Sequence, residues 1–150
     1  MLRDELQNSL KEAMKNRDMQ TVSAVRLIIA GQKEKDVEAR GKGQEKATDA
    51  DLLSMMQSMI KQRNESIKIY TQSNRPDLAA KEQSEIDVIQ RFLPKQMNPE
   101  EIESLIKSLI AQTGASGMKD MGKIMSVLKA QYAGQLDFGA ASGVIKKLLS

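Results

Sequence analysis

The segment 118–125 combines lysines with a glycine inside a helical pattern, which is the arrangement in this chain best suited to binding chemistry. Lys119 and Lys123 are four residues apart, and Gly122 lies between them. A glycine inside a helix costs about 0.5 to 1 kcal/mol relative to alanine, so its presence needs a physical reason. Two reasons are equally open: another helix packs closely at Gly122, or an RNA backbone approaches there. The second reason gives these candidate RNA-binding residues, with the lysines contacting phosphates: Lys119, Gly122, Lys123, Lys129, Lys146 and Lys147.

The charge distribution favours the same end of the chain. The 150 residues carry a net charge of only +3. The stretch from Ser104 to the C-terminus holds six lysines and two aspartates, whereas the preceding part is close to neutral. A locally basic end is a weak indication of a polyanionic partner.

Other residue types with reactive side chains are better explained by structure. The chain has no Cys and no His, which excludes disulfides, thiolate metal sites and triads that use imidazole or thiol. We interpret the carboxylates of 34–38 and 100–103 as solvated helix faces, and the Ser-to-Lys spacings near 116 and 142 as caps beside surface lysines. Gly114 and Gly117 predict a turn rather than a phosphate loop, because no strand precedes them. We therefore predict no catalytic residue, no metal and no cofactor.

Hydrophobic residues recur every three or four positions nearly throughout, and no segment alternates with period two, so the predicted fold is all-α. Ten methionines and only four aromatic residues indicate that methionine fills gaps in the core, in preference to forming a peptide groove or a soft-metal site. The polar second half of the second helix, 31–47, predicts a solvated arm. Helices are expected over 2–14, 18–41, 48–72, 76–93, 98–113, 116–132 and 137–149.

Two prolines in the segment 93–99 mark the best boundary, because they interrupt a continuous helix. This predicts an N-terminal helical domain with a long helical hairpin over 1–97, and a C-terminal three-helix tail domain over 98–150. No apolar run approaches the roughly 20 residues of a membrane span, and the N-terminus lacks the apolar region of a signal peptide. We expect a cytoplasmic protein with no membrane partner and no DNA partner.

The run Asp120–Met125 (D-M-G-K-I-M), together with Gly134, Asp137 and the final V-I-K-K-L-L, resembles the tail domain of the B subunit of glutamine-dependent aspartyl/glutamyl-tRNA amidotransferase. The whole chain is similar to the small stand-alone proteins of the GatB/YqeY family. The shared features are the opening L-x-x-x-L-x-x-x-L, the stretch Arg26–Leu27–Ile28 and the sequence L-P-K-Q-M before the tail. The resemblance implies an all-helical N-terminal domain followed by a three-helix tail.

In the amidotransferase, the tail helps to hold misacylated tRNA while other domains perform the chemistry. Gly122 and Lys123 match the glycine and lysine of the tail motif, whereas Lys119, Lys129, Lys146 and Lys147 are only basic neighbours. The family label is carbon–nitrogen ligase activity with glutamine as amido-N-donor. The serine–serine–lysine arrangement of the amidase subunit and the ATP and metal ligands of the B subunit are absent, so we attribute that label to the association.

The resemblance implies a non-catalytic, tRNA-associated module, with tRNA as the expected partner. Amidotransferase subunits or another protein are the candidate protein partners. The alternative is a protein–protein adaptor whose partner lays a helix on the N-terminal arm, residues 31–47.

Overall fold

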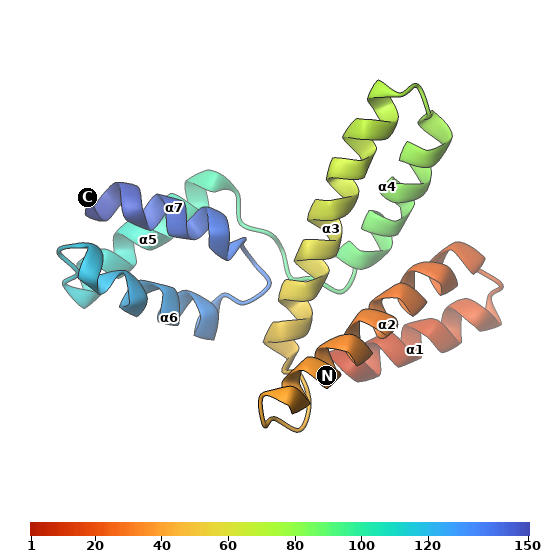
Figure 1. Cartoon of the computed structure of the whole chain (residues 1–150), viewed down its shortest axis with the longest axis horizontal. Helices are drawn as coiled ribbons and strands as arrows, with labels where there is room; N and C mark the ends of the chain where they lie inside the picture. The colour runs from red at the N-terminus through yellow and green to blue at the C-terminus, as the bar shows by residue number, and fades with distance from the viewer. The chain divides into compact units, whose positions relative to one another are not determined.

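The structure, a computed structural model, describes residues 1–150 and consists of helices joined by short connections (Figure 1). It contains no strand, so the all-α prediction is confirmed. A short 3-10 turn, η1, precedes the sixth helix. The elements are α1 (Leu2–Lys15), α2 (Met19–Gly41), α3 (Asp49–Gln72), α4 (Pro76–Gln90), α5 (Pro99–Thr113), η1 (Met118–Asp120), α6 (Met121–Gln131) and α7 (Phe138–Leu149).

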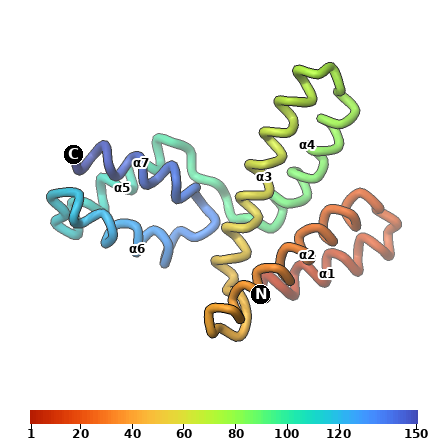
Figure 2. The backbone as a smooth tube through the Cα atoms, in the orientation of Figure 1, coloured from red at the N-terminus to blue at the C-terminus, as the bar shows by residue number.

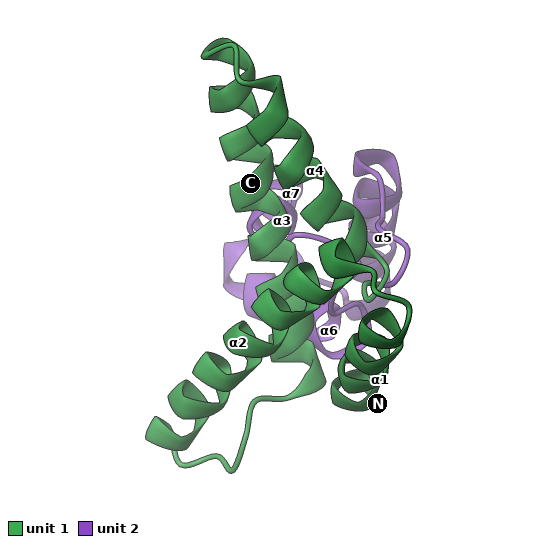
Figure 3. Cartoon of the chain, turned by 90° about the vertical axis from the view of Figure 1, so that its right-hand side faces the viewer, with its two compact units in different colours: residues 1–93 green, residues 94–150 purple.

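The chain forms two compact units, residues 1–93 and residues 94–150 (Figure 3). We placed the domain boundary after residue 97. In the structure, the backbone N–H of Met97 donates to the carbonyl of Gln135 at 2.8 Å. This hydrogen bond ties the segment before α5 to the C-terminal unit, which includes residues 94–97.

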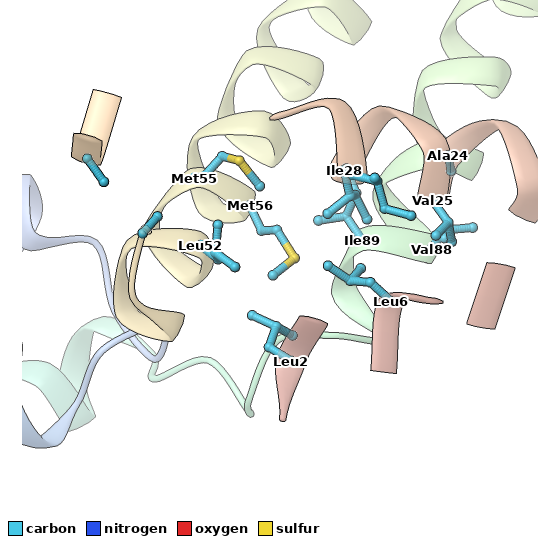
Figure 4. Close-up of a cluster of buried hydrophobic side chains, with 13 residues drawn as sticks. Leu2, Leu6, Ala24, Val25, Ile28, Leu52, Met55, Met56, Val88 and Ile89 are labelled. Atoms are coloured by element: carbon cyan, nitrogen blue, oxygen red, sulfur yellow. The ribbon is translucent and has the colours of Figure 1, made fainter. Parts of the chain in front are cut away.

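The N-terminal unit consists of two helical hairpins, α1–α2 and α3–α4, whose course can be followed in Figure 2. All four helices contribute apolar side chains to one core, shown in Figure 4. Burial of such side chains is the main driving force for the assembly of these helices. The fully buried members with the largest side chains include Leu6, Ile28, Leu52, Met56 and Ile89.

Side-chain caps start four of the helices at the predicted residues. One of these caps is Asp137, whose carboxylate accepts from the Gly139 N–H at the start of α7. The Asp18 carboxylate accepts from the Thr21 N–H at the start of α2. Thr48 begins α3, and Asn98 begins α5, each with a capping box that pairs it with the acidic residue three positions on. These caps satisfy N–H groups that have no partner within their own helix.

Three large apolar residues, on α2, α1 and η1, are exposed. Val37 is 64% exposed, Met14 is 51% exposed and Met118 is 46% exposed. Val37 follows Ile29 by eight residues, which rotates it about 80° away from the buried stripe of α2. Ala39 is buried near that end of the helix instead. The prediction that methionines fill the core is right for Met55 and Met56 and wrong for Met118.

Arg17 offers a stability prediction, because it adopts the left-handed conformation with φ of 56° after the end of α1. The Asp18 N–H closes this helix end by donating to the Ala13 carbonyl at 2.9 Å. Glycine is favoured at this position, so Arg17→Gly should raise the free energy of unfolding by about 0.5 to 1 kcal/mol. Urea denaturation measures the change. Asn74→Gly is the control, with a smaller expected gain because asparagine tolerates the same conformation better. Equal or no gains would contradict the prediction.

Candidate nucleic-acid interface

The C-terminal unit packs α5, α6 and α7 around a small apolar core. Ile124 and Leu128 of α6 are fully buried in it, as are Ile106 of α5 and Ile145 of α7. Burial of one face of α6 turns its opposite face outward, because residues three or four positions apart share a face. The packing of the core therefore decides which side of α6 is accessible.

Gly122 lies on the exposed side of α6. A Cβ atom built at this glycine would have no neighbouring atom within 4 Å. The nearby hydroxyl of Ser126 donates to the Gly122 carbonyl at 2.8 Å, within the same helix. No helix of the C-terminal unit packs against Gly122, so close packing within this unit does not explain the glycine. Approach of an external backbone remains a prediction.

Lys119 and Lys123 belong to different elements. The predicted helix over 116–132 is therefore wrong at its start. Lys119 lies on η1, and α6 begins only at Met121. Between the lysines, Asp120 is buried and accepts from the Ser116 N–H at 3.1 Å. That backbone hydrogen bond lowers the pKa of Asp120, with Lys123 adding to the effect.

Asp120 also forms an ion pair with the exposed Lys123, with 3.6 Å between the Lys123 Nζ and the Asp120 carboxylate. The carboxylate thus links the turn before η1 to the lysine of the motif. Because Asp120 already occupies the Ser116 N–H, this group is not free to bind a phosphate. The interpretation of Gly114–Gly117 as a turn fits this arrangement, in which Gly114 is left-handed with φ of 69°.

The remaining candidate lysines lie at helix ends and are exposed. Lys129 is in the last turn of α6, and Lys146 and Lys147 are in the last turn of α7. Cations at these positions also interact favourably with the helix dipole, which is a structural role independent of RNA. Lys129 projects about 120° away from Lys123 around the axis of α6. The candidate lysines therefore point in different directions and do not form one continuous strip.

Small side chains separate these lysines. Ser126 and Ala130 are exposed on α6 at intervals of four residues from Gly122, and Ala140 and Gly143 are exposed on α7. We did not predict these residues as part of the interface. The signal in the sequence was the recurrence of Gly, Ser and Ala every three or four positions, opposite the apolar stripe. Such a surface lets another backbone approach closely.

Two of the three carboxylates in the segment 34–38 of α2, those of Asp36 and Glu38, are engaged in structural pairs. Asp36 binds Arg3 with two hydrogen bonds of 2.8 and 2.6 Å, and Glu38 pairs with Lys35 at 3.0 Å. No three acidic side chains come together in a way that would hold a metal ion. None of the helices combines the length and the apolar character required to cross a bilayer.

Comparison with known proteins identifies similar chains. A family model described as "Yqey-like protein" matches residues 3–149. The chain is 34% identical over 88 residues to "Altered inheritance of mitochondria protein 41, mitochondrial" of Saccharomyces cerevisiae, covering 59% of this chain and 46% of the relative. It is 30% identical over 132 residues to the protein of the same description in Pyrenophora tritici-repentis, covering 84% of this chain and 70% of that relative. The chain spans about half the length of the yeast relative.

Proposed function

Because the chain belongs to the family of YqeY-like proteins, we propose that it is a non-catalytic helical module that associates with tRNA and assists glutamine-dependent tRNA amidation. The observation that carries this proposal is the open Gly122, flanked by Lys123 on the accessible face of α6. The resemblance of Asp120–Met125 to the amidotransferase tail motif supports the choice of tRNA. Amidotransferase subunits are the protein partners that this function favours.

The charges on α6, on α7 and on the segment between them support a phosphate contact. From residue 121 to the end there are four lysines and a single acidic residue, Asp137. Lysines that neutralise phosphates release counterions, so this mode of binding must weaken as salt rises. The small side chains on α6 and α7 allow a sugar–phosphate backbone to come near the helix surface, and contacts of this kind position an RNA without reading its sequence.

Titration of unacylated and aminoacylated tRNA at two salt concentrations tests the function. We expect binding tighter than about 10⁻⁴ M, the weak end of non-specific contact, with an affinity that falls as salt rises. Affinity that is weaker than this or indifferent to salt contradicts the proposal. Incubation with glutamine, ATP and misacylated tRNA should yield no amidated product without other subunits. Turnover that a single substitution abolishes would show an enzyme instead.

Gly122→Leu separates an RNA contact from a structural role. The Cβ of the leucine meets no neighbouring atom, and leucine is a better helix former than glycine, so the melting temperature should rise slightly. The same side chain would hold an RNA backbone away, so tRNA affinity should fall several-fold. Ala111→Leu, on the exposed side of α5, is the control and should leave binding unchanged. A lower melting temperature for Gly122→Leu would mean that the glycine is required for folding.

A second candidate function, the protein–protein adaptor, is favoured by exposed apolar residues on α2. Leu27 is 44% exposed and Val37 is 64% exposed. Deletion of residues 32–46 is a poor test of the adaptor function. It would remove Asp36 and the buried Ala39, both of which stabilise the fold. Val37→Glu keeps these contacts. Unchanged recovery of a co-purifying protein with this variant would argue against a role for that part of α2.

A cytoplasmic location remains part of the proposal. The relatives are described as mitochondrial proteins. Fractionation of the source cells tests the location of this chain directly.

A further inference from the structure

A groove of about 740 Å³ lies between α2 and α3 in the N-terminal unit. The two helices diverge from the connection that joins them (Figure 1). They meet at Gly31, where a Cβ atom would lie 2.8 Å from the Met55 sulfur. The glycine thus lets Met55 rest against the backbone of α2 and forms the floor of the groove.

Each wall of the groove is one continuous helical face. Leu27, Gly31 and Glu34 follow one another on α2 at intervals of four and three residues. Ser54, Ser58 and Gln62 follow one another on α3 at intervals of four residues, with Met55 and Met59 beside them. A third helix can pack onto two neighbouring helical faces that have this spacing and several short side chains. Its larger side chains would fill the space over the serines. Met59 is only partly buried and suits such a surface, because a flexible methionine adapts to its partner, whereas Met55 is held in the core.

The charges on the walls specify the partner further. Lys35 is paired with Glu38 at 3.0 Å, and Arg63 is paired with Glu85 at 2.8 Å. The Asp51 carboxylate accepts from the Thr48 N–H as part of a helix cap. Glu34 and Lys42 have no such partner, and Glu34 is exposed on the α2 wall. A cation on the incoming helix would therefore meet an unpaired carboxylate.

From these observations we propose that the α2–α3 groove binds one amphipathic helix of a partner protein, with an apolar face over Met55 and Met59 and a lysine or arginine opposite Glu34. The α2 wall extends over 12 residues from Leu27 to Glu38, about 17 Å, so the bound helix has about three turns. This inference rests on the adaptor function and names its binding surface. The inference does not depend on the proposed RNA interface on α6 and α7.

Fluorescence polarisation with a designed peptide tests the proposal on the full chain. The probe is a labelled helical peptide of about 14 residues with leucines along one face and one lysine at the edge of that face. A peptide with the same composition in scrambled order is the control. We expect saturable binding of the amphipathic peptide, tighter than about 1 mM, and much weaker binding of the scrambled one.

Charge exchange then locates the site. Glu34→Lys should weaken binding about fivefold, and a peptide whose lysine is replaced by glutamate should recover affinity for this variant. Glu65→Lys, an exposed site on α3 outside the groove, should change nothing. Ser58→Trp fills the groove and should abolish binding, while circular dichroism confirms that the variant remains helical.

Three results would overturn the proposal: no saturable binding, equal effects of Glu34→Lys and Glu65→Lys, or a dimer seen by light scattering that Ser58→Trp dissociates. The last result would assign the groove to a second copy of the chain. Glu34→Lys and Ser58→Trp should leave tRNA binding unchanged, so failure of the groove and failure of the RNA function are measured separately. Loss of tRNA binding in both variants would instead assign the groove to RNA.

Discussion

Asp36→Asn is expected to lower the free energy of unfolding of the N-terminal unit by about 2 kcal/mol. The Asp36 carboxylate accepts two hydrogen bonds from Arg3 and one, of 2.9 Å, from the Ala47 N–H. Arg3 also donates to the Ala47 carbonyl at 2.8 Å. One carboxylate therefore joins the start of α1 to the second half of α2 and to the residue before α3. Its side chain is only 13% exposed, so water replaces the lost bonds poorly.

The same group predicts how stability depends on pH. The hydrogen bonds from Arg3, aided by the Ala47 N–H, lower the pKa of Asp36 from 3.8 to about 2. A carboxyl whose pKa is lower in the folded state stabilises the fold above the unfolded-state value. The contribution is therefore complete above about pH 4 and is lost as pH falls towards 2. In Asp36→Asn, the free energy of unfolding should therefore depend less on pH between about 4 and 2 than in the unmodified chain.

Urea denaturation at several pH values measures both effects. The chain has two tyrosines and no Trp, so in a Tyr132→Phe background Tyr70 fluorescence reports the N-terminal unit alone. Asp77→Asn is the control, because its pair with Arg75 is more than half exposed and should contribute little to stability. Equal losses for the two variants would show that the Asp36 bonds add nothing beyond a surface ion pair.

Replacement of four lysines by glutamine is expected to reduce tRNA affinity about a hundredfold at low salt. These residues are Lys123, Lys129, Lys146 and Lys147. If each contacts one phosphate, the slope of log affinity against log salt should fall by about 3, since each neutralised phosphate contributes about 0.7 to 0.9. Filter binding or fluorescence titration over a range of salt concentrations gives both quantities.

A matched set of lysines provides the control for this prediction. Four exposed lysines of the N-terminal unit, replaced by glutamine, change the net charge of the chain by the same amount and should leave most of the affinity. They are Lys11, Lys61, Lys68 and Lys81. If both sets lose affinity equally, the attraction depends on total charge, and the C-terminal unit has no special role.

Local signals made much of the fold predictable. Capping residues such as Thr48 and Asn98 bind N–H groups within their own helix, so their effect is visible in a few consecutive residues. The apolar spacing of three and four likewise reports a helix without knowledge of its neighbours. The predicted start of the sixth helix was wrong, because a local side-chain hydrogen bond favours a different backbone conformation there. The link from the Asp120 carboxylate to the Ser116 N–H favours a 3-10 turn, so α6 starts at Met121.

The sequence by itself determined the helical class, the helix caps, the basic C-terminal end and the family resemblance at Asp120–Met125, because each depends on neighbouring residues or on residue types. Only the tertiary structure decided that Gly122 is open and that Val37 is exposed. It alone brought Arg3, Asp36 and Ala47 together, and it alone opened a groove beside Met55. These features depend on which helix packs against which face, and that is settled by contacts between residues far apart in the chain.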